Sequence, residues 1–308
     1  MPYLIFGGAV LLILVTLVLS YLAFKAPFGG GKYMTDPYEV KREDVRKKVE
    51  GMRPHIDFIL SHEREEVRIR AKDGTELVAD YFHVKDGAPI ELGVHGYRSM
   101  GPHDLYGGGA EALRAGHNLL LIDQRAHGRS GGKAITFGAL ESHDVKSWAE
   151  YLVGRFGEDI KILLFGMSMG AATVLIASGL DLPRQVKGII ADCPCSYCWD
   201  ILSSVGNRKG APVWLFKPFV FLGARLFGKF NMKDTDVRVA VKRASVPILL
   251  IHGLSDDFVP AYMSEEIKAA NDGITIALFK GATHVESYLS DTQRYVKLIS
   301  EFKKEVLK

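Results

Sequence analysis

Short apolar runs alternate with amphipathic segments over most of this chain. From about residue 64 onward, compact runs have the length and apolar character of buried strands, and longer segments between them have apolar positions at helical spacing. Segments 66–70 and 76–83 alternate polar and apolar residues around Lys72-Asp73-Gly74, which is typical of a β-hairpin. The compact runs are 89–94, 118–122, 160–165, 186–191, 247–251 and 274–279, and the helical segments are 104–115, 141–156, 169–180, 261–271 and 288–306.

This alternation of strands and helices predicts an α/β fold, in which helices cover both faces of a mainly parallel sheet. In open sheets of that class, ligands bind beyond the carboxyl ends of the strands. The turns that follow the strands are therefore the places where chemistry is expected.

The start of the chain departs from this pattern. Residues 3–24 contain no charged side chain, and about 20 such residues suffice to cross a hydrocarbon core of roughly 30 Å. The segment lacks the basic start and the small-residue cleavage site of a signal peptide, so we expect a single-pass membrane anchor over residues 1–24. Since Lys25, Lys32 and the basic pair at 41–42 all follow it, the positive-inside rule places the rest of the chain in the cytoplasm.

Residues 25–60 are expected to form a tether between this anchor and the folded part of the chain. Gly29-Gly30-Gly31 is typical of a flexible joint, and a charged, helical stretch follows at about 37–53. The remaining residues, 61–308, are expected to form one globular domain.

Composition and charge exclude several classes of protein. The chain is 47% hydrophobic and 24% charged, which is ordinary for a globular protein, and its net charge of +3 without a basic stripe argues against nucleic-acid binding. The three cysteines crowd into the segment from Cys193 to Cys198, with Cys195 between them, and their odd number argues against a disulfide framework. No histidine or fourth cysteine lies nearby in sequence to complete a zinc site, so we expect packing roles and no metal.

A serine stands where a strand is expected to turn into a helix. Gly166-Met167-Ser168-Met169-Gly170 follows the run 160–165 and precedes an apolar helical segment. A serine in such a tight turn needs small neighbours, its hydroxyl projects, and the start of the helix favours developing negative charge. The Gly-x-Ser-x-Gly pattern alone is weak, but its position between strand and helix makes it informative.

Two later strand ends carry an acid and a histidine. The run 247–251 leads to the adjacent Asp256 and Asp257, and the run 274–279 leads to His284, so the order along the chain is Ser, Asp, His. Imidazole, with an ordinary pKa of about 6.5, can take the proton of a serine hydroxyl, and a buried carboxylate fixes its tautomer. We therefore expect Ser168 to be the nucleophile, His284 the general base, and one of the two aspartates the residue that orients the histidine.

Residues 64–308 resemble the α/β-hydrolase superfamily, and within it the group similar to monoacylglycerol lipases and serine aminopeptidases. The matching segments are His95-Gly96-Tyr97, the loop 123–131, the turn at Ser168, Asp256-x-x-Val259-Pro260 and Gly281-Ala-x-His284. The resemblance implies the α/β-hydrolase fold, an active site that needs no cofactor or metal, and Asp256 rather than Asp257 as the acid. It also implies an oxyanion hole made by the backbone N–H groups of Tyr97 and Met169.

Two residues depart from the family's pattern. Ala126 and Met100 stand where glycine is common. These departures put the shape of two loops in doubt and leave the three side chains of the expected triad untouched.

The stretch between the runs 186–191 and 247–251 is longer than a crossover helix needs. In the superfamily such insertions form a helical cap over the active site, expected here at about 196–240. Residues 201–233 contain no acidic side chain but many aromatic and basic ones. Either the aromatic face packs on the sheet while the cations are solvated, or the cap is a basic amphipathic lid at a bilayer surface.

The expected function is hydrolysis of carboxylic esters, with a small-molecule or lipid-like apolar acyl substrate, by an enzyme that contacts the membrane through residues 3–24. If the cap is the amphipathic lid, it is a second point of membrane contact. An amide or peptide hydrolase using the same triad is the alternative, although a cap without carboxylates suits the ammonium group of a peptide poorly. A non-catalytic binding protein that kept the fold is a third alternative, because a fold alone does not prove activity.

Overall fold

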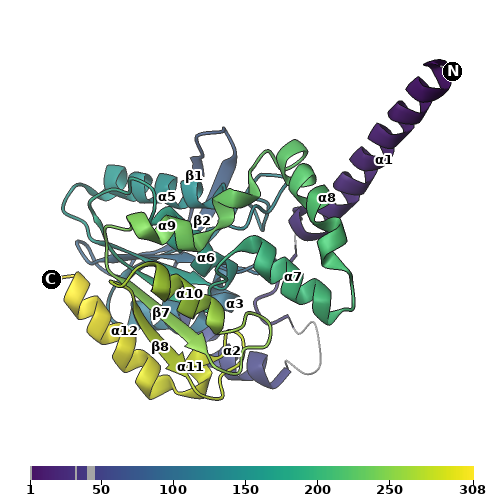
Figure 1. Ribbon diagram of the computed structural model, residues 1–308. Coiled ribbons are helices and arrows are strands. Elements are labelled where there is room, and N and C mark those ends of the chain that lie inside the picture. The colour runs from purple at the N-terminus through teal and green to yellow at the C-terminus, as the bar shows by residue number, and fades with distance from the viewer. Residues whose placement is uncertain (1, 32, 40–45) are drawn as a thin grey trace.

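An eight-stranded sheet forms the centre of the computed structural model, which describes residues 2–31, 33–39 and 46–308 (Figure 1). The strands lie in the order β1-β2-β4-β3-β5-β6-β7-β8. Their bounds are β1 Glu65–Arg70, β2 Glu76–Phe82, β3 Ile90–Val94, β4 Asn118–Asp123, β5 Ile162–Met167, β6 Val186–Asp192, β7 Ile248–Gly253 and β8 Thr275–Phe279.

The sheet is antiparallel at one edge and parallel elsewhere. β1 pairs with β2 as the predicted hairpin, β2 runs antiparallel to β4, and every other neighbouring pair is parallel. Every residue of β3, β4, β5 and β7 is buried, because helices cover both faces of a parallel sheet, and most of these residues are therefore apolar. The predicted fold class is confirmed.

The helices lie in two layers. On one face of the sheet, Trp148 and Leu175 join an apolar cluster, and on the other face Ile56 and Tyr295 belong to a second cluster. The helices are α1 Pro2–Phe28, α2 Arg46–Leu60, α3 Gly101–Asp104, α4 Tyr106–Arg114, α5 Glu141–Phe156, α6 Met169–Ala177, α7 Cys198–Arg208, α8 Val213–Leu226, α9 Val237–Ala240, α10 Tyr262–Ala270, α11 Ser287–Ser290 and α12 Thr292–Val306.

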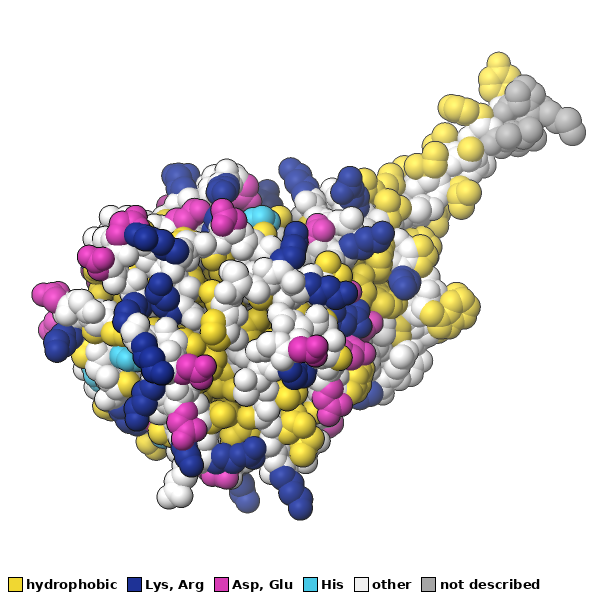
Figure 2. Space-filling model, turned by 60° about the vertical axis from the view of Figure 1, so that its left-hand side comes forward, with side chains coloured by type: hydrophobic (Ala, Val, Ile, Leu, Met, Phe, Trp, Pro, Cys, Tyr) yellow, Lys and Arg dark blue, Asp and Glu magenta, His cyan; other side chains and the backbone are white. Residues whose placement is uncertain are grey.

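The first helix, α1, projects from the body of the molecule over most of its length (Figure 1). Figure 2 shows hydrophobic side chains along the projecting part, whereas Lys and Arg side chains begin at the body. The segment Phe6–Phe28 is long and apolar enough to cross a membrane, a property that membrane anchors and signal sequences share.

The end of α1 differs from the expected tether. The helix continues beyond residue 24 to Phe28, which is fully buried with its ring edge against Phe137 and Phe230. The glycines that follow are hydrogen-bonded rather than free, with the Gly30 N–H donating to the Lys133 carbonyl at 3.0 Å. A Cβ at Gly30 would lie 2.7 Å from that of Ala126, so this glycine permits a close backbone contact. The predictions of the tether and of the membrane orientation also used residues that lie outside the described part of the chain, namely Lys32 and residues 40–45, which include Lys41 and Arg42.

Candidate active site

The turn between β5 and α6 holds Ser168 in a strained conformation. Its backbone has φ +54° and ψ −116°, outside the regions that L-residues favour. A Cβ at Gly166 would lie 2.3 Å from the Gly170 carbonyl oxygen, and one at Gly170 would lie 2.1 Å from the Val94 carbonyl oxygen. The turn can form only because both flanking positions lack a side chain, which explains the spacing of glycines around the serine.

The structure brings together the three side chains that the sequence singles out. His284, in the loop after β8, places its Nε2 3.0 Å from the Ser168 Oγ. Its Nδ1 lies 2.6 Å from the Oδ2 of Asp256, which follows β7. Asp256 is buried whereas Asp257 is exposed, so the histidine contacts the aspartate that the family pattern selects.

The Asp256 carboxylate is held as an anion by its hydrogen bonds. Burial alone would raise its pKa, but hydrogen bonds to His252 and His284 outweigh burial and bring the pKa well below its ordinary value. Its other oxygen accepts the backbone N–H groups of Phe258 and Val259, at 2.9 and 2.8 Å. The carboxylate is therefore fixed in position as well as in charge.

His252 also contributes to this site. Its Nε2 lies 3.4 Å from the Asp256 Oδ2 and 2.8 Å from the Val259 carbonyl oxygen, and its Nδ1 contacts the Ser264 hydroxyl at 2.6 Å. The ring thus braces the loop that carries Asp256.

A second buried carboxylate, Asp192, lies at the end of β6. Burial raises its pKa to about 7, although the hydrogen bond that it accepts from the Tyr295 hydroxyl at 2.9 Å acts to lower the pKa. The Ser287 hydroxyl approaches its other oxygen at 3.4 Å. These contacts direct the Asp192 side chain toward α11 and α12 rather than toward His284.

The residues expected to supply the oxyanion hole both border Ser168. Met169 is the first residue of α6, and Tyr97 follows Gly96, at which a Cβ would lie 3.2 Å from the Ser168 Cβ. The Gly96 N–H donates to the buried Asp104 carboxylate at 2.6 Å, which fixes this loop beside the serine. Tyr97 and Met169 line the same cavity as Ser168.

Two further histidines hold loops near the site. His95 Nε2 accepts the Gln124 N–H at 3.1 Å, and His127 Nε2 accepts the Arg98 N–H at 3.0 Å. Burial lowers the pKa of His127 to about 3, so its ring is neutral and able to accept.

Cys193 raises the question of a metal, because its sulfur lies within 4.8 Å of ligand atoms of Asp256 and His284. Burial raises the pKa of this thiol well above its ordinary value. Both other side chains already bond to one another. Cys193 instead contacts the Met167 sulfur at 3.7 Å, in keeping with a packing role.

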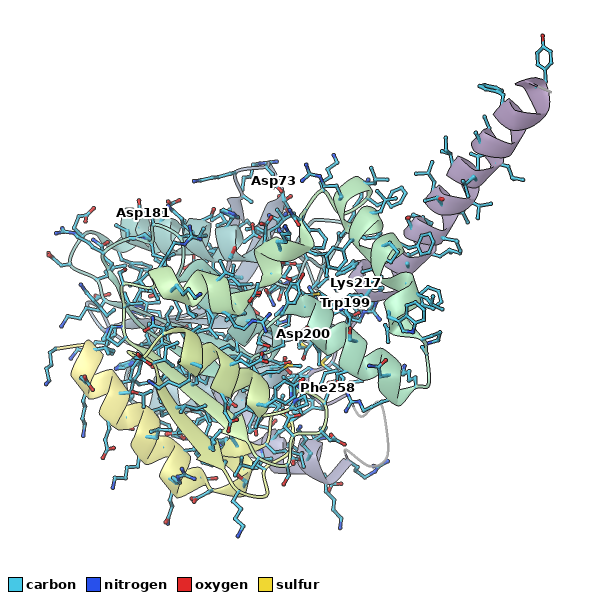
Figure 3. All side chains as sticks on the ribbon, viewed as in Figure 1. Asp73, Asp181, Trp199, Asp200, Lys217 and Phe258 are labelled. Atoms are coloured by element: carbon cyan, nitrogen blue, oxygen red, sulfur yellow. The ribbon has the colours of Figure 1, made fainter. Side chains whose placement is uncertain are left out.

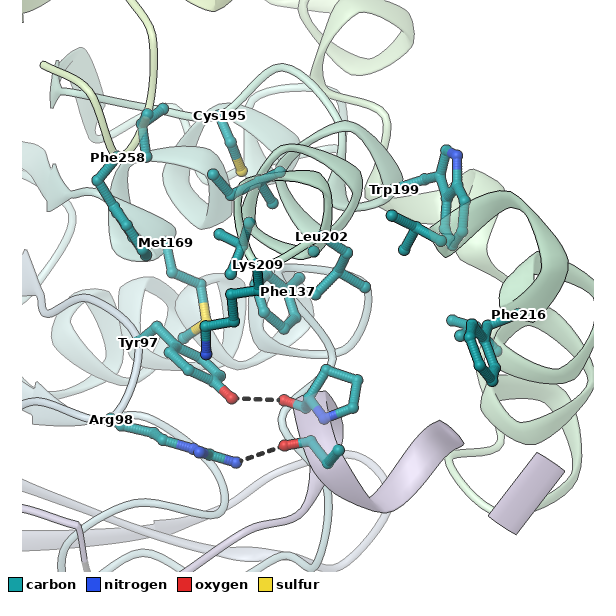
Figure 4. Close-up of a pocket in the computed structure, with 18 of the residues that line it drawn as sticks. Tyr97, Arg98, Phe137, Met169, Cys195, Trp199, Leu202, Lys209, Phe216 and Phe258 are labelled. Carbon is teal, nitrogen blue, oxygen red and sulfur yellow. Dashed lines mark hydrogen bonds between the residues drawn. The ribbon is translucent and has the colours of Figure 1, made fainter. Parts of the chain in front are cut away.

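A cavity of about 520 Å³ lies beside Ser168 (Figure 4). Its lining is mostly apolar and comes from α1, α7, α8 and the loops next to the serine. Arg98 and Lys209 are the charged side chains of this lining, and none of the described residues that form it carries a carboxylate. The apolar lining residues include Phe137, Trp199, Leu202, Val205, Val213, Phe216 and Val220.

The insertion between β6 and β7 supplies α7 and α8, which cover part of this cavity. Some of its aromatic residues pack inward: Trp199 meets Phe221 edge to face, and the Lys217 ammonium lies 5.3 Å from the Trp199 ring centre (Figure 3). Others face outward, and Trp214 is 73% exposed. The cap therefore combines a packed inner face with an exposed apolar outer face.

Comparison with known proteins finds relatives over most of the chain. Residues 93–231 match the family model described as serine aminopeptidase, S33. The chain is 30% identical over 224 residues to the protein Rv2307c of Mycobacterium tuberculosis, covering 71% of each chain. It is 28% identical over 193 residues to YqkD of Bacillus subtilis, covering 62% of this chain and 63% of that protein, slightly under two thirds.

Solved structures with the same fold include two hydrolases of archaea. The Pyrococcus furiosus esterase Pf2001 has a TM-score of 0.67 and 23% identity, with 90% of this chain and all of that chain covered. The Pyrococcus horikoshii acylaminoacyl peptidase has a TM-score of 0.58 and 20% identity, with 79% of this chain and 42% of that chain covered. At this identity the likeness establishes the architecture, and the named activities are those of the two archaeal proteins.

Proposed function

Because the chain belongs to the α/β-hydrolase superfamily and its residues 93–231 match the family model described as serine aminopeptidase, S33, we propose that it is a serine hydrolase of carboxylic esters with apolar acyl groups. One observation carries this proposal. Ser168 is hydrogen-bonded to His284, which is hydrogen-bonded to Asp256, and Ser168 lines a largely apolar cavity.

The proposed reaction follows from this arrangement. His284 Nε2 takes the hydroxyl proton as Ser168 Oγ attacks the ester carbonyl carbon, and Asp256 stabilises the resulting imidazolium. The backbone N–H groups of Tyr97 and Met169 stabilise the negative charge on the carbonyl oxygen. His284 then gives its proton to the leaving alcohol, and the acyl group remains on Ser168. A water molecule that His284 deprotonates releases the acid and restores the serine.

The charge of the cavity favours an acyl ester over a free peptide. An aminopeptidase must bind the ammonium group at the start of its substrate, which requires a nearby anion. The two charged residues of the lining, Arg98 and Lys209, are both cationic and would repel that group. An apolar acyl chain fits the remaining lining.

We also propose that α1 anchors the enzyme in a membrane with its folded body in the cytoplasm. The length and apolar character of Phe6–Phe28 support anchoring. Lys25 in the last turn of α1 and the exposed Arg225 and Lys229 of the cap place basic side chains on the body's side of the apolar segment.

An activity profile of the purified full-length protein tests the ester assignment. The substrates are p-nitrophenyl esters of increasing acyl length and aminoacyl p-nitroanilides, with Ser168→Ala as the control for background hydrolysis. We expect kcat/KM for medium-length and long esters to exceed that for the anilides by about tenfold or more. A preference for the aminoacyl anilides would reject the ester assignment in favour of the amide alternative.

A further inference from the structure

The end of the projecting helix α1 forms part of the cavity wall. Ala23, Ala26 and Pro27 line the same cavity as Ser168 (Figure 4). Two of these three side chains are only methyl groups. A helix that merely tethered the enzyme would have no need to border the space beside the nucleophile.

Two hydrogen bonds fix the end of α1 to the loop beside the nucleophile. The Tyr97 hydroxyl donates to the Pro27 carbonyl oxygen and the Arg98 guanidinium donates to that of Ala26, both at 2.8 Å (Figure 4). The last carbonyls of a helix have no partners within the helix, so side-chain donors stabilise this end. The same loop supplies the expected oxyanion donor, so the helix and the site share one structural unit.

Close packing joins α1 to the cap helix α8. A Cβ at Gly223 would lie 2.4 Å from the Ser20 carbonyl oxygen and 2.7 Å from the Phe24 Cβ, so the two helices touch through a glycine. Tyr21 and Phe24 contact the Phe227 ring, with centres 5.3 and 6.0 Å apart. The two helices together enclose one side of the cavity.

The outer surface of this helix pair suits a bilayer interface. Trp214, Leu215 and Leu226 of α8 are exposed, and so are Tyr21 and Leu22 of α1. Figure 2 shows hydrophobic side chains continuing from the body into the apolar projecting segment. Aromatic side chains favour the level of the lipid headgroups. Exposed basic side chains at the end of α1 and in the cap, which attract anionic headgroups, include Lys25, Arg225 and Lys229.

We propose that α1 is a wall of the acyl-binding site, and that the acyl chain of an ester lipid in the bilayer lies against Ala23 and Ala26 when its carbonyl reaches Ser168. The small side chains of these two residues leave room for a long chain, so they determine the acyl length that the enzyme accepts. This inference rests on the proposed ester hydrolysis and extends it from the triad to the helix that holds the enzyme at its substrate.

Bulky substitutions in the wall test the inference in the full-length protein, reconstituted in phosphatidylcholine vesicles that contain phosphatidylglycerol. Ala26→Trp and Ala23→Leu place bulk in the cavity, whereas the control Leu22→Trp introduces an indole at an exposed side chain outside the cavity lining. We expect the ratio of kcat/KM for dodecanoate to that for acetate esters to fall about tenfold or more in the wall variants. The control should keep the wild-type ratio, and thermal unfolding should show all variants folded.

If both wall variants keep the wild-type ratio, including through an equal loss of kcat/KM for short and long esters, the proposal that α1 forms a wall of the acyl-binding site is wrong. Labelling of Ser168 by ethyl and dodecyl fluorophosphonates gives the same ratio without ester turnover. If the wild type is labelled but cleaves no ester, ester hydrolysis is rejected. The labelling ratio, dodecyl over ethyl, then tests the wall without ester hydrolysis. The proposed wall is upheld if this ratio falls in Ala26→Trp and is rejected if it does not.

Discussion

Two buried carboxylates lie near Ser168 at the ends of adjacent strands, and their surroundings shift their pKa values in opposite directions. Hydrogen bonds lower the pKa of Asp256 and keep it anionic, whereas burial raises the pKa of Asp192 to about 7. Only an anion stabilises the imidazolium that forms when His284 takes the serine proton. The two aspartates therefore form a matched pair for testing which carboxylate serves the histidine.

Asp256→Asn should lower kcat for ester hydrolysis by about 10³–10⁴-fold, because the amide no longer holds the catalytic tautomer of His284. Asp192→Asn keeps the size of the side chain and should leave kcat within about tenfold of the wild type. Steady-state kinetics on one ester, after thermal unfolding has shown both variants folded, compares them. The reverse ranking of the two variants would assign the orienting role to Asp192.

The sequence could predict the positions of single residues where a local pattern determines them. Ser168 and His284 each follow a recognisable strand, and the family's spacing separates Asp256 from Asp257. The contact of His252 with Asp256 was not predicted, because a lone histidine next to a strand is compatible with many environments. Its neighbours Ser264 and Val259 come from elements whose relative placement only the folded chain reveals.

At the scale of elements, the strands were predictable because their burial on both faces leaves near-continuous apolar runs. The structure at the end of α1 was not predictable from the sequence in this way. Gly29-Gly30-Gly31 is typical of a flexible joint, yet tertiary contacts override that local preference. Phe28 is anchored between Phe137 and Phe230, which lie more than a hundred residues away in the chain, and the glycines follow it into backbone hydrogen bonds.

A glycine-to-alanine pair tests the packing of α1 on α8. In Gly223→Ala the new methyl group would lie 2.4 Å from the Ser20 carbonyl oxygen, so the helices must separate, at a cost of about 1–3 kcal/mol. Gly154→Ala in α5 adds a methyl group with no atom within 4 Å and should be neutral or stabilise by about 0.5–1 kcal/mol.

Thermal unfolding of both full-length variants in the same detergent, followed by tryptophan fluorescence, gives the comparison. We expect a lower Tm for Gly223→Ala than for the wild type and no loss for Gly154→Ala. Equal Tm values for the two variants would show that α1 and α8 do not pack closely.

At the scale of the whole molecule, the fold gathers at one rim of the sheet residues that are distant in the chain. Ser168 and His284 are 116 positions apart, and the end of α1 and the cap form part of the wall of the cavity beside them. The parallel topology predicts that strand ends meet, so the triad could be expected from the sequence. The partnership of α1 with α8 could not, because periodicity shows which face of a helix is apolar and not what covers it.

The rate and site of labelling by a fluorophosphonate test the central claim most directly, with the modified residue mapped by mass spectrometry. We predict that the folded wild type is modified at Ser168, that Ser168→Ala is not modified, and that His284→Ala reacts slower by about 10³-fold or more. His83→Ala, a control at an exposed histidine, should react at the wild-type rate. Modification at another residue, or a His284→Ala variant that reacts as fast as the wild type, would contradict the account.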